Sequence, residues 1–205
     1  IKMRILIACE ESQTVCKAFR AKGHEAYSCD ILPPSGGHPE WHIQDDVLKH
    51  LDEGWDMKIA HPPCTHLSVS GARWFVKEAG KFRKPIRLRN EALVFVKKLL
   101  DAPIEKIALE NPVSVIASHI RKSNQLIHPW QFGHPEEKRT CLWLKNLPLL
   151  KPTKNVYKKM MKLPQRERQR IWWMGSGHGY ERSKTFQGIA DAMAEQWSII
   201  NPLNA

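Results

Sequence analysis

The sequence predicts an α/β domain built on a mostly parallel, doubly wound sheet. Short apolar runs of strand length alternate with helical patterns along most of the 205 residues. Chemically reactive side chains follow several of these runs, as expected where ligands bind beyond the carboxyl ends of parallel strands. A chain of this length suits one domain with its own core, with or without a small appendage.

The first half of the chain contains three expected strands and one helix. The strands cover residues 3–8, 24–31 and 57–61, and the helix covers residues 12–23. Ser12 is the expected N-cap of that helix, and Gly23 is the expected residue that ends it. The third strand stops at two prolines, Pro62 and Pro63, which cannot donate to a sheet ladder.

The second half contains two further expected strands and two helices. An amphipathic helix covers residues 88–100, strands cover 104–112 and 140–144, and a closing helix covers 183–197 with Ser183 as its cap. Residues 151–180 are the least regular stretch. We therefore expect one main domain formed by residues 1–150 and 181–205, interrupted by a short basic insertion or small lobe over 151–180.

Basic residues are concentrated in two segments of a chain whose net charge is +11. Lys81–Lys98 holds seven basic residues and one acidic residue, and Lys151–Arg170 holds eight and one. Two such segments on a nearly neutral body suggest a surface that binds a polyanion, although they are also compatible with solvated helix faces. The residues expected to contact nucleic acid are Arg83, Lys84, Arg87, Arg89, Lys158, Lys159 and Lys162.

The apolar and cysteine content indicates a soluble protein of a reducing compartment. No run approaches the roughly 18 apolar residues that span a bilayer, and the first strand is too short for a signal peptide. The five cysteines are scattered without a CxxC pair, which suggests free thiols. We therefore expect a cytoplasmic protein. His38 and His42 have i,i+4 spacing but no evident third ligand, so we expect no metal site.

Four side chains with chemical potential stand just after predicted strands: Glu10, Asp30, Cys64 and Glu110. Cys64 lies in the stretch AHPPCTHLSVSGARW, directly behind two prolines that keep it out of a helix. A nucleophilic thiol needs such a fixed and accessible position. Each residue also has a structural interpretation: a buried loop thiol for Cys64, a helix cap for Glu110 and a turn residue for Asp30.

Several short motifs resemble those of the cytosine-C5 DNA methyltransferases, and most of all their short phage and prophage relatives. PPCTHLSVSG (62–71) resembles the Pro-Cys motif, and ENP (110–112) resembles the Glu-Asn-Val motif. YSCDI (27–31) resembles the acidic strand end that holds the cofactor ribose, and QDDV (44–47) is placed like the acidic residue beside the cofactor adenine. KRTCLWL (138–144) and the closing helix are similar to the arginine strand and the final motif.

The resemblance implies a Rossmann-like S-adenosylmethionine-dependent methyltransferase fold and a set of site residues. Cys64, Glu110 and Arg139 correspond to the catalytic residues. The cofactor S-adenosyl-L-methionine would be bound by Glu10, Ser12, Asp30, Ile31, Asp46 and Pro62. The sequence departs from the family at the first motif, where ACEESQTV replaces a glycine-rich loop, and at Glu137, which replaces the first arginine of the arginine motif.

The implied chemistry is methyl transfer to C5 of cytosine in DNA. The thiolate of Cys64 adds to C6 and turns C5 into an enamine-like carbon that attacks the sulfonium methyl group. Glu110 supplies a proton or hydrogen bond at N3, and Arg139 binds the O2 oxygen. A base in a duplex would have to be flipped into the pocket.

Two other functions remain open from the sequence. The resemblance implies that residues 1–150 and 181–205 form a catalytic methyltransferase domain and that 151–180 is a reduced target-recognition segment. Because this segment is short, the same thiol chemistry could act on RNA or on a free pyrimidine nucleotide. A non-catalytic fold that binds nucleic acid is also compatible with the missing glycine loop. Trp172 and Trp173 could stack on an unpaired base or pack in the core.

Overall fold

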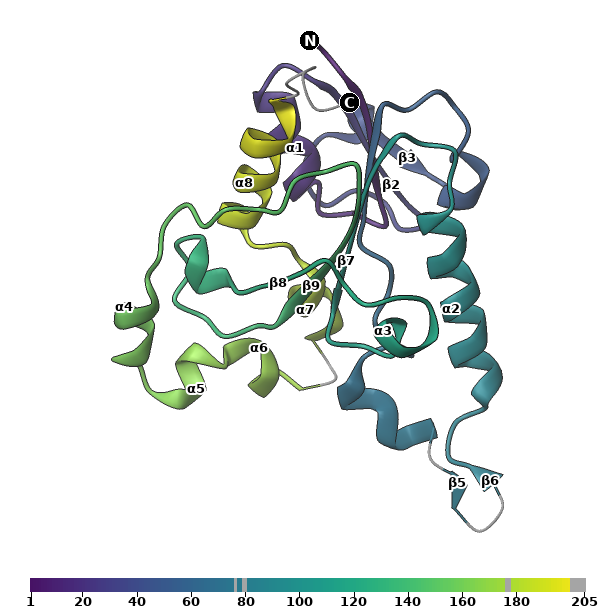
Figure 1. Cartoon of the computed structure of the whole chain (residues 1–205), viewed down its shortest axis with the longest axis vertical. Coiled ribbons are helices and arrows are strands. Elements are labelled where there is room, and N and C mark those ends of the chain that lie inside the picture. The colour runs from purple at the N-terminus through teal and green to yellow at the C-terminus, as the bar shows by residue number, and fades with distance from the viewer. Residues whose placement is uncertain (76, 79–80, 176–177, 200–205) are drawn as a thin grey trace.

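The computed structural model describes residues 1–75, 77–78, 81–175 and 178–199 (Figure 1). In this part of the chain the main sheet has seven strands in the order β3-β2-β1-β4-β7-β9-β8. The strands are β1 (Arg4–Ala8), β2 (Glu25–Asp30), β3 (His42–Gln44), β4 (Met57–Ala60), β7 (Lys106–Pro112), β8 (Gln125–Ile127) and β9 (Thr140–Lys145). All neighbouring pairs are parallel except those of β9, which runs antiparallel to β7 and β8. This is the predicted α/β architecture with a mostly parallel, doubly wound sheet.

Helices cover both faces of the sheet. The longer ones are α1 (Thr14–Ala21), α2 (Ile86–Leu100) and α8 (Gln187–Ser198). Helices α1 and α8 lie together on one face and α2 lies on the other (Figure 1). Each face has its own apolar core: Phe19 and Trp197 belong to one, and Leu99 and Trp143 belong to the other. The sheet is therefore buried on both sides, as expected for parallel strands.

The remaining elements are short. They are the helices α3 (Ile116–His119), α4 (Tyr157–Met161), α5 (Gln165–Arg168), α6 (Arg170–Trp173) and α7 (Gly179–Ser183), the 3₁₀ turns Pro39–Trp41, Val47–Lys49, Val69–Phe75 and Pro129–Gln131, and a two-stranded hairpin of β5 (Lys77–Glu78) and β6 (Lys81–Phe82). Helices α4, α5 and α6 lie to one side of the sheet (Figure 1). They lie within the irregular segment 151–180, whose role as an insertion stays a prediction.

The five expected strands are present, and the structure adds two at the sheet edges. The additional strands, β3 and β8, have only three residues each, too few to show an alternating pattern in the sequence. The fifth expected strand, β9, is antiparallel, which its composition does not reveal. Among the described residues, no helix combines the length and the apolar character needed to cross a membrane.

Both expected serine caps are wrong, whereas the expected glycine stop is confirmed. Helix α1 begins at Thr14, and the hydroxyl of Ser12 contacts that of Thr14 instead. Ser183 ends the short helix α7, and α8 begins four residues later without a side-chain cap. Gly23 follows α1 with a φ of +86°, a left-handed conformation that glycine adopts without strain.

Candidate active site

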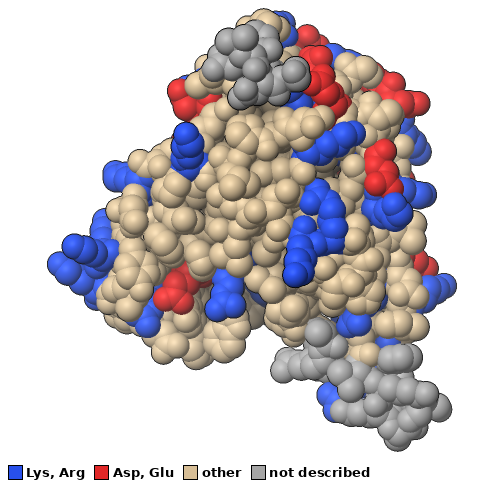
Figure 2. Space-filling model, viewed as in Figure 1, with Lys and Arg blue, Asp and Glu red and all other residues tan. Residues whose placement is uncertain are grey.

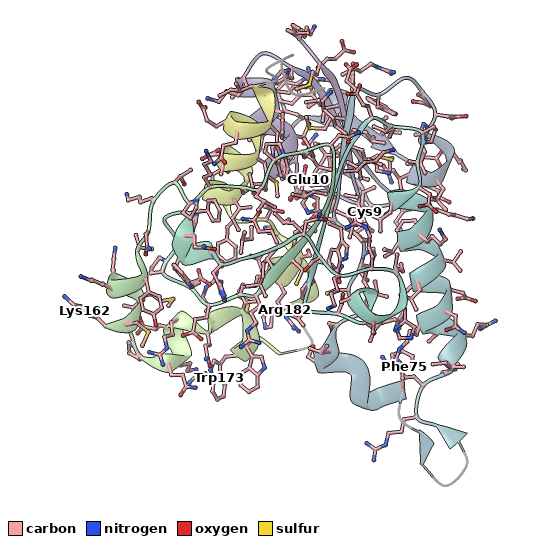
Figure 3. All side chains as sticks on the ribbon, viewed as in Figure 1. Cys9, Glu10, Phe75, Lys162, Trp173 and Arg182 are labelled. Atoms are coloured by element: carbon pink, nitrogen blue, oxygen red, sulfur yellow. The ribbon has the colours of Figure 1, made fainter. Side chains whose placement is uncertain are left out.

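The predicted site residues meet at the carboxyl edge of the sheet. Strands β1, β2, β4 and β7 are parallel, so their carboxyl ends lie on one side. Cys9 and Glu10, which follow β1, lie near the middle of the molecule in Figure 3, and Arg182 lies below them in that view. The loop that contains Cys64 leaves the same edge at the end of β4.

Backbone and side-chain hydrogen bonds hold the loop of Cys64 in place. Asn111 of β7 is buried, and its Nδ2 donates to the carbonyl of Pro62 over 2.9 Å. The amides of Leu67 and Ser68 donate to the carbonyl of Cys64 over 3.0 and 2.9 Å, which forms a turn that begins at this residue. Cys64 itself is partly buried. The thiol is therefore fixed beside β7 without being sealed in a core.

Glu110 lies inside β7, where it pairs with a histidine that the sequence analysis passed over. Ala60 of β4 is paired with Leu109 of β7, so the next residues, His61 and Glu110, are neighbours. His61 Nδ1 and Glu110 Oε2 are 3.0 Å apart, and both side chains are nearly buried. Helix α3 starts beyond Glu110 with Val115 at its N-cap, so Glu110 does not cap it.

Burial and charge oppose each other at Cys64. Burial raises the pKa of the thiol above its usual value, and the negative charge of Glu110 raises it further. The positive charges of Lys138 and Arg182 act in the other direction and lower this pKa. The two cations that favour the thiolate of Cys64, Lys138 and Arg182, therefore come from residues far along the chain from it.

Of the two neighbouring cations Lys138 and Arg139, only Lys138 acts on the group formed by Cys64, His61 and Glu110. The charge of Lys138 affects the pKa of Cys64, His61 and Glu110. Its Nζ donates to the carbonyl of Arg182 over 3.2 Å. Arg139 is exposed, and the group whose pKa it lowers is His128. Adjacent residues of an extended segment point to opposite sides, which separates the two cations.

The loop after β1 adopts without glycine the backbone conformation that glycine favours. Cys9 and Gln13 have φ values of +59° and +57°. Both oxygens of Glu10 accept hydrogen bonds from the first turn of α1, from the amides of Val15 (2.7 Å) and Cys16 (3.1 Å). Glu10 thus does the capping that the sequence suggests for Ser12. Burial nevertheless raises its pKa.

The other predicted cofactor residues line the edge formed by β1, β2 and β4. Asp30 ends β2, and its Oδ1 accepts a hydrogen bond from the amide of Leu32 over 2.9 Å, as a turn residue does. Ile31 follows with 72% of its surface exposed, a high value for an isoleucine. Asp46 is exposed and caps a 3₁₀ turn, whereas Pro62 is buried.

The predicted nucleic-acid contacts lie in two places. Lys158, Lys159 and Lys162 are exposed on or beside α4. Lys and Arg side chains gather over α4 at one rim of the molecule (Figure 2), where Lys162 projects outward (Figure 3). Arg83 and Arg87 are exposed near the start of α2, and Lys84 and Arg89 are half-buried there. The guanidinium of Arg89 lies 4.3 Å from the centre of the Phe75 ring, so this arginine is packed against the protein.

Trp172 and Trp173 lie on the surface, so the alternative that they pack in the core is wrong. Their exposed fractions are 65% and 51%, and their rings meet edge to face. Helix α6, which holds them, is tied to the residues before Lys138. Glu137 receives a hydrogen bond from Gln169, and Glu136 forms an ion pair with Arg170. The aromatic pair is therefore anchored next to the strand that leads into the site.

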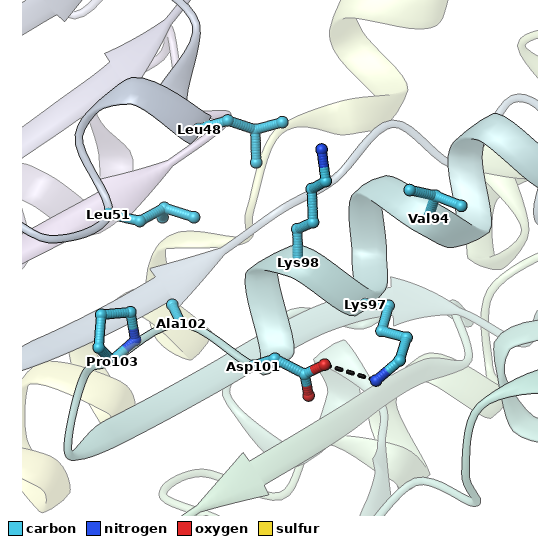
Figure 4. Close-up of a pocket in the computed structure, with 8 residues that line it drawn as sticks. All are labelled: Leu48, Leu51, Val94, Lys97, Lys98, Asp101, Ala102 and Pro103. Atoms are coloured by element: carbon cyan, nitrogen blue, oxygen red, sulfur yellow. Dashed lines mark hydrogen bonds and ion pairs between the residues drawn. The ribbon is translucent and has the colours of Figure 1, made fainter.

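Two surface hollows lie outside the residues at the strand ends. One, of about 480 Å³, lies between the end of α2 and the turn after β3 (Figure 4) and is lined by Leu48, Leu51, Val94, Lys97, Lys98, Asp101, Ala102 and Pro103. The other, of about 580 Å³, is lined by Pro135, Glu136, Leu163, Arg166, Glu167, Arg170, Trp173 and Met174. The second includes Leu163, which follows Lys162 in the chain, and Trp173 of α6.

No metal centre is formed by the described residues, among which His, Cys, Asp and Glu make no suitable cluster of three. His38 and His42, whose spacing drew attention in the sequence, have structural partners. The His38 ring stacks on Trp41 at 3.7 Å. The two ring nitrogens of His42 lie 2.8 Å from Ser28 Oγ and 2.9 Å from the carbonyl of Leu32.

The sequence reasoning missed His61 and Lys138. Both are adjacent to residues that it selected: His61 precedes Pro62, and Lys138 precedes Arg139. The motif resemblance points instead to Pro62 and Arg139. Only strand register and side-chain direction identify these two residues as the ones that face Cys64 and Glu110.

Comparisons with known proteins give structural likenesses only. No protein-family model and no curated protein matches the sequence. Among solved structures, the chain is similar to the Dnmt2 methyltransferase of S. pombe, with 16% identity, a TM-score of 0.48, and coverage of 82% of this chain and 57% of that one. It is also similar to a protein assigned as a DNA modification methyltransferase from an E. coli prophage, with 14% identity, a TM-score of 0.46, and coverage of 80% and 56%. The chain spans little more than half the length of either.

Proposed function

We propose that this protein transfers a methyl group from S-adenosylmethionine to C5 of cytosine in DNA, through a covalent bond between Cys64 and C6 of the base. The observation that supports this most directly is the contact between the ends of β4 and β7. Asn111, which follows Glu110 in β7, donates to the carbonyl of Pro62 in the loop of Cys64 over 2.9 Å, and the charge of Glu110 acts on the pKa of the Cys64 thiol. A nucleophile next to an acid-base group at a strand end is the arrangement that this addition needs.

The residues at the ends of β1 and β2 suit the proposed cofactor. S-adenosylmethionine is a cation with a free amino group and ribose hydroxyls, so it calls for acidic partners. The buried Oε2 of Glu11 has no hydrogen-bond partner among the described residues, and Asp30 is placed to accept from a ribose. Exposed Ile31 offers an apolar surface for an adenine ring. When bound there, the cofactor supplies an electrophilic methyl group.

The protein's own residues would perform the other steps. Cys64 Sγ bonds to C6 as a thiolate, favoured by the charges of Lys138 and Arg182. Glu110 faces the ring nitrogen N3 and controls its proton, while Lys138 balances negative charge on the ring. After methyl transfer a base removes the C5 proton, the Sγ–C6 bond breaks and the thiolate returns.

The basic and aromatic surface supports a polymeric substrate. Lys158, Lys159 and Lys162 are exposed beside α4, and the exposed pair Trp172 and Trp173 lies on the neighbouring helix α6. Lysines bind phosphates, and tryptophan rings stack on unpaired bases. A flipped base and its unpaired neighbours would meet both kinds of side chain.

Intact-mass analysis tests the proposal. The parent protein is incubated with S-adenosylmethionine and an oligonucleotide that contains 5-fluorocytosine, whose fluorine blocks the last elimination. We expect a stable adduct with the mass of protein, oligonucleotide and one methyl group. Cys64→Ser should give none, because a hydroxyl is a poor nucleophile here. Cys141→Ala, which removes a buried thiol from β9, should still form it.

The choice of oligonucleotide separates the alternatives. Duplex DNA, single-stranded DNA, RNA and the free nucleotide are compared at equal concentration. If an adduct forms only with RNA or only with the nucleotide, the substrate assignment changes and the proposed thiol chemistry stands. Tight binding of nucleic acid without any adduct would identify a non-catalytic binding protein, and an adduct that survives in Cys64→Ser would refute the assignment of the nucleophile.

A further inference from the structure

His61 lies among charged groups from three neighbouring elements. Its Nδ1 is 3.0 Å from Oε2 of Glu110 on β7, and its backbone amide donates to the carbonyl of Ala8 at the end of β1. Glu10, after β1, and Lys138, before β9, both act on the ring electrostatically. The side chains of His61 and Glu110 are only 8% and 9% exposed. The two groups therefore form a buried pair.

The contact with Glu110 is the only hydrogen bond that the described residues make with the ring of His61. The second nitrogen, Nε2, is buried and has no partner. A proton on Nδ1 can therefore leave the ring only towards Glu110. A buried, half-satisfied ring of this kind is costly to maintain, and its place in the site calls for a functional reason.

The environment keeps the proton of the pair on the imidazole. Burial lowers the pKa of His61, but the hydrogen bond and charge of Glu110, together with the charge of Glu10, raise it overall. Burial raises the pKa of Glu110, but His61 and Lys138 lower it overall. Both directions, together with the 3.0 Å contact, favour the ion pair of an imidazolium and a carboxylate over the neutral pair.

A resting carboxylate has no proton to give to the base. When a thiolate adds to C6, the electron pair of the C5–C6 double bond moves through C4 to N3, and N3 must gain a proton. Glu110 can deliver one only if another group replaces it. Among the described residues, the proton-bearing side chain in contact with Glu110 is His61.

We propose that His61 is the proton reservoir of Glu110: as the Sγ–C6 bond forms, the Nδ1 proton moves to Oε2 and Glu110 delivers a proton to N3. This inference rests on the proposed function. The imidazole becomes neutral. The proton that N3 gains neutralises the negative charge that the thiolate brought to the ring. When the thiolate leaves, N3 returns its proton to Glu110 and His61 is charged again. His61 acts through Glu110 and is a positioning residue.

The variant His61→Asn separates the proton from the hydrogen bond. The Asn amide can donate to Glu110 from nearly the place of Nδ1, but it stores no exchangeable proton. Without the reservoir, Glu110 must be protonated itself, which occurs at lower pH. We expect the ratio of parent to variant rate of adduct formation to be within a few-fold at pH 5.5 and to reach about tenfold or more at pH 8, since one pKa unit corresponds to a tenfold change.

The ratio of the two rates cancels the ionisation of Cys64, which both proteins share. A purely structural effect of the substitution would lower the rate by the same factor at every pH, and this result would overturn the inference. Thermal unfolding confirms that the variant is folded. If it is not, His61→Gln takes its place.

Nuclear magnetic resonance tests the pair without substrate. A ¹⁵N titration should give a pKa for His61 above the usual 6.5 in the parent, and a clearly lower pKa in Glu110→Gln, where only the charge of Glu10 still opposes burial. An unchanged pKa in that variant would refute the coupling. If the parent forms adducts and the rate ratio is flat with pH, only the role of His61 fails. If the parent forms no adduct, the proposed function fails with it.

Discussion

At the scale of single residues, Lys138 and Arg139 show how one position along the chain decides which groups a cation acts on. The charge of Lys138 lowers the pKa of Cys64 and of Glu110, whereas Arg139 is exposed and its charge is felt at His128. The family resemblance assigns the catalytic role to Arg139. The geometry favours Lys138, which also differs from arginine in having a compact ammonium group in place of a planar fork.

Replacing Lys138 by Met should make the thiol of Cys64 less reactive. The change removes a positive charge that favours the thiolate, so the pKa of Cys64 rises. At pH 8 we expect alkylation of Cys64 by iodoacetamide, followed by peptide mass spectrometry, to slow about three- to tenfold. Arg139→Met is the matched control and should leave the rate within twofold. Equal slowing in both variants would contradict the placement of Lys138 beside the thiol.

At the scale of elements, the segment after β2 packs directly on the loop after β1. The Ser35 amide donates to the carbonyl of Glu11 over 2.8 Å, and Gln13 exchanges hydrogen bonds with the backbone of His38 in both directions. Gly36 lies at the closest approach. A Cβ at Gly36 would be 2.5 Å from Gln13 Cβ and 2.6 Å from the carbonyl oxygen of Ser12.

Gly36→Ala should destabilise the protein because that contact has no room for a methyl group. Either the loop or the segment must shift, and overpacking of this kind costs about 1–3 kcal/mol in the free energy of unfolding. Urea denaturation measures the loss. Gly179→Ala is the control, since a Cβ there meets nothing within 4 Å, and it should cost nothing. Equal stability of the two variants would show that the segment is not packed as described.

At the scale of the whole molecule, two basic surfaces flank the carboxyl edge of the sheet. Lys162 and Trp173 lie on one side and Phe75, beside the start of α2, lies on the other, with Arg182 between them (Figure 3). The two basic segments are separate in the sequence: one includes α4, and the other includes the start of α2. A nucleic-acid strand could contact both while one base enters the site between them.

Neutralising Lys158, Lys159 and Lys162 together should weaken binding of all DNA sequences about equally. Phosphate contacts position a nucleic acid and do not read its sequence. The slope of log affinity against log salt should become flatter by up to about 0.9 for each lost duplex contact. Fluorescence anisotropy at several KCl concentrations measures both effects. A triple variant of lysines elsewhere on the surface, Lys2, Lys22 and Lys49, is the control.

A loss of affinity confined to one target sequence would mean that these lysines read bases. An unchanged salt slope would move the phosphate contacts to another surface, and the Arg83–Arg89 stretch at the start of α2 would be the next to test.

The sequence by itself determined the central strands, the long helices and the placement of Glu10, Asp30, Cys64 and Glu110 at or near the carboxyl ends of strands. These features are local: an apolar run of strand length, a helical period or a pair of prolines acts within a few residues. Gly23 belongs to the same class, because its left-handed conformation is a property of one residue.

Only the tertiary structure decided how these parts combine. The edge strands β3 and β8, the antiparallel direction of β9 and the capping of α1 by Glu10 all depend on partners far along the chain or outside the helix. The same holds for His61 and Lys138. Their roles come from strand register and from the side of the backbone on which a side chain emerges, and a shift of one residue would exchange them for their neighbours.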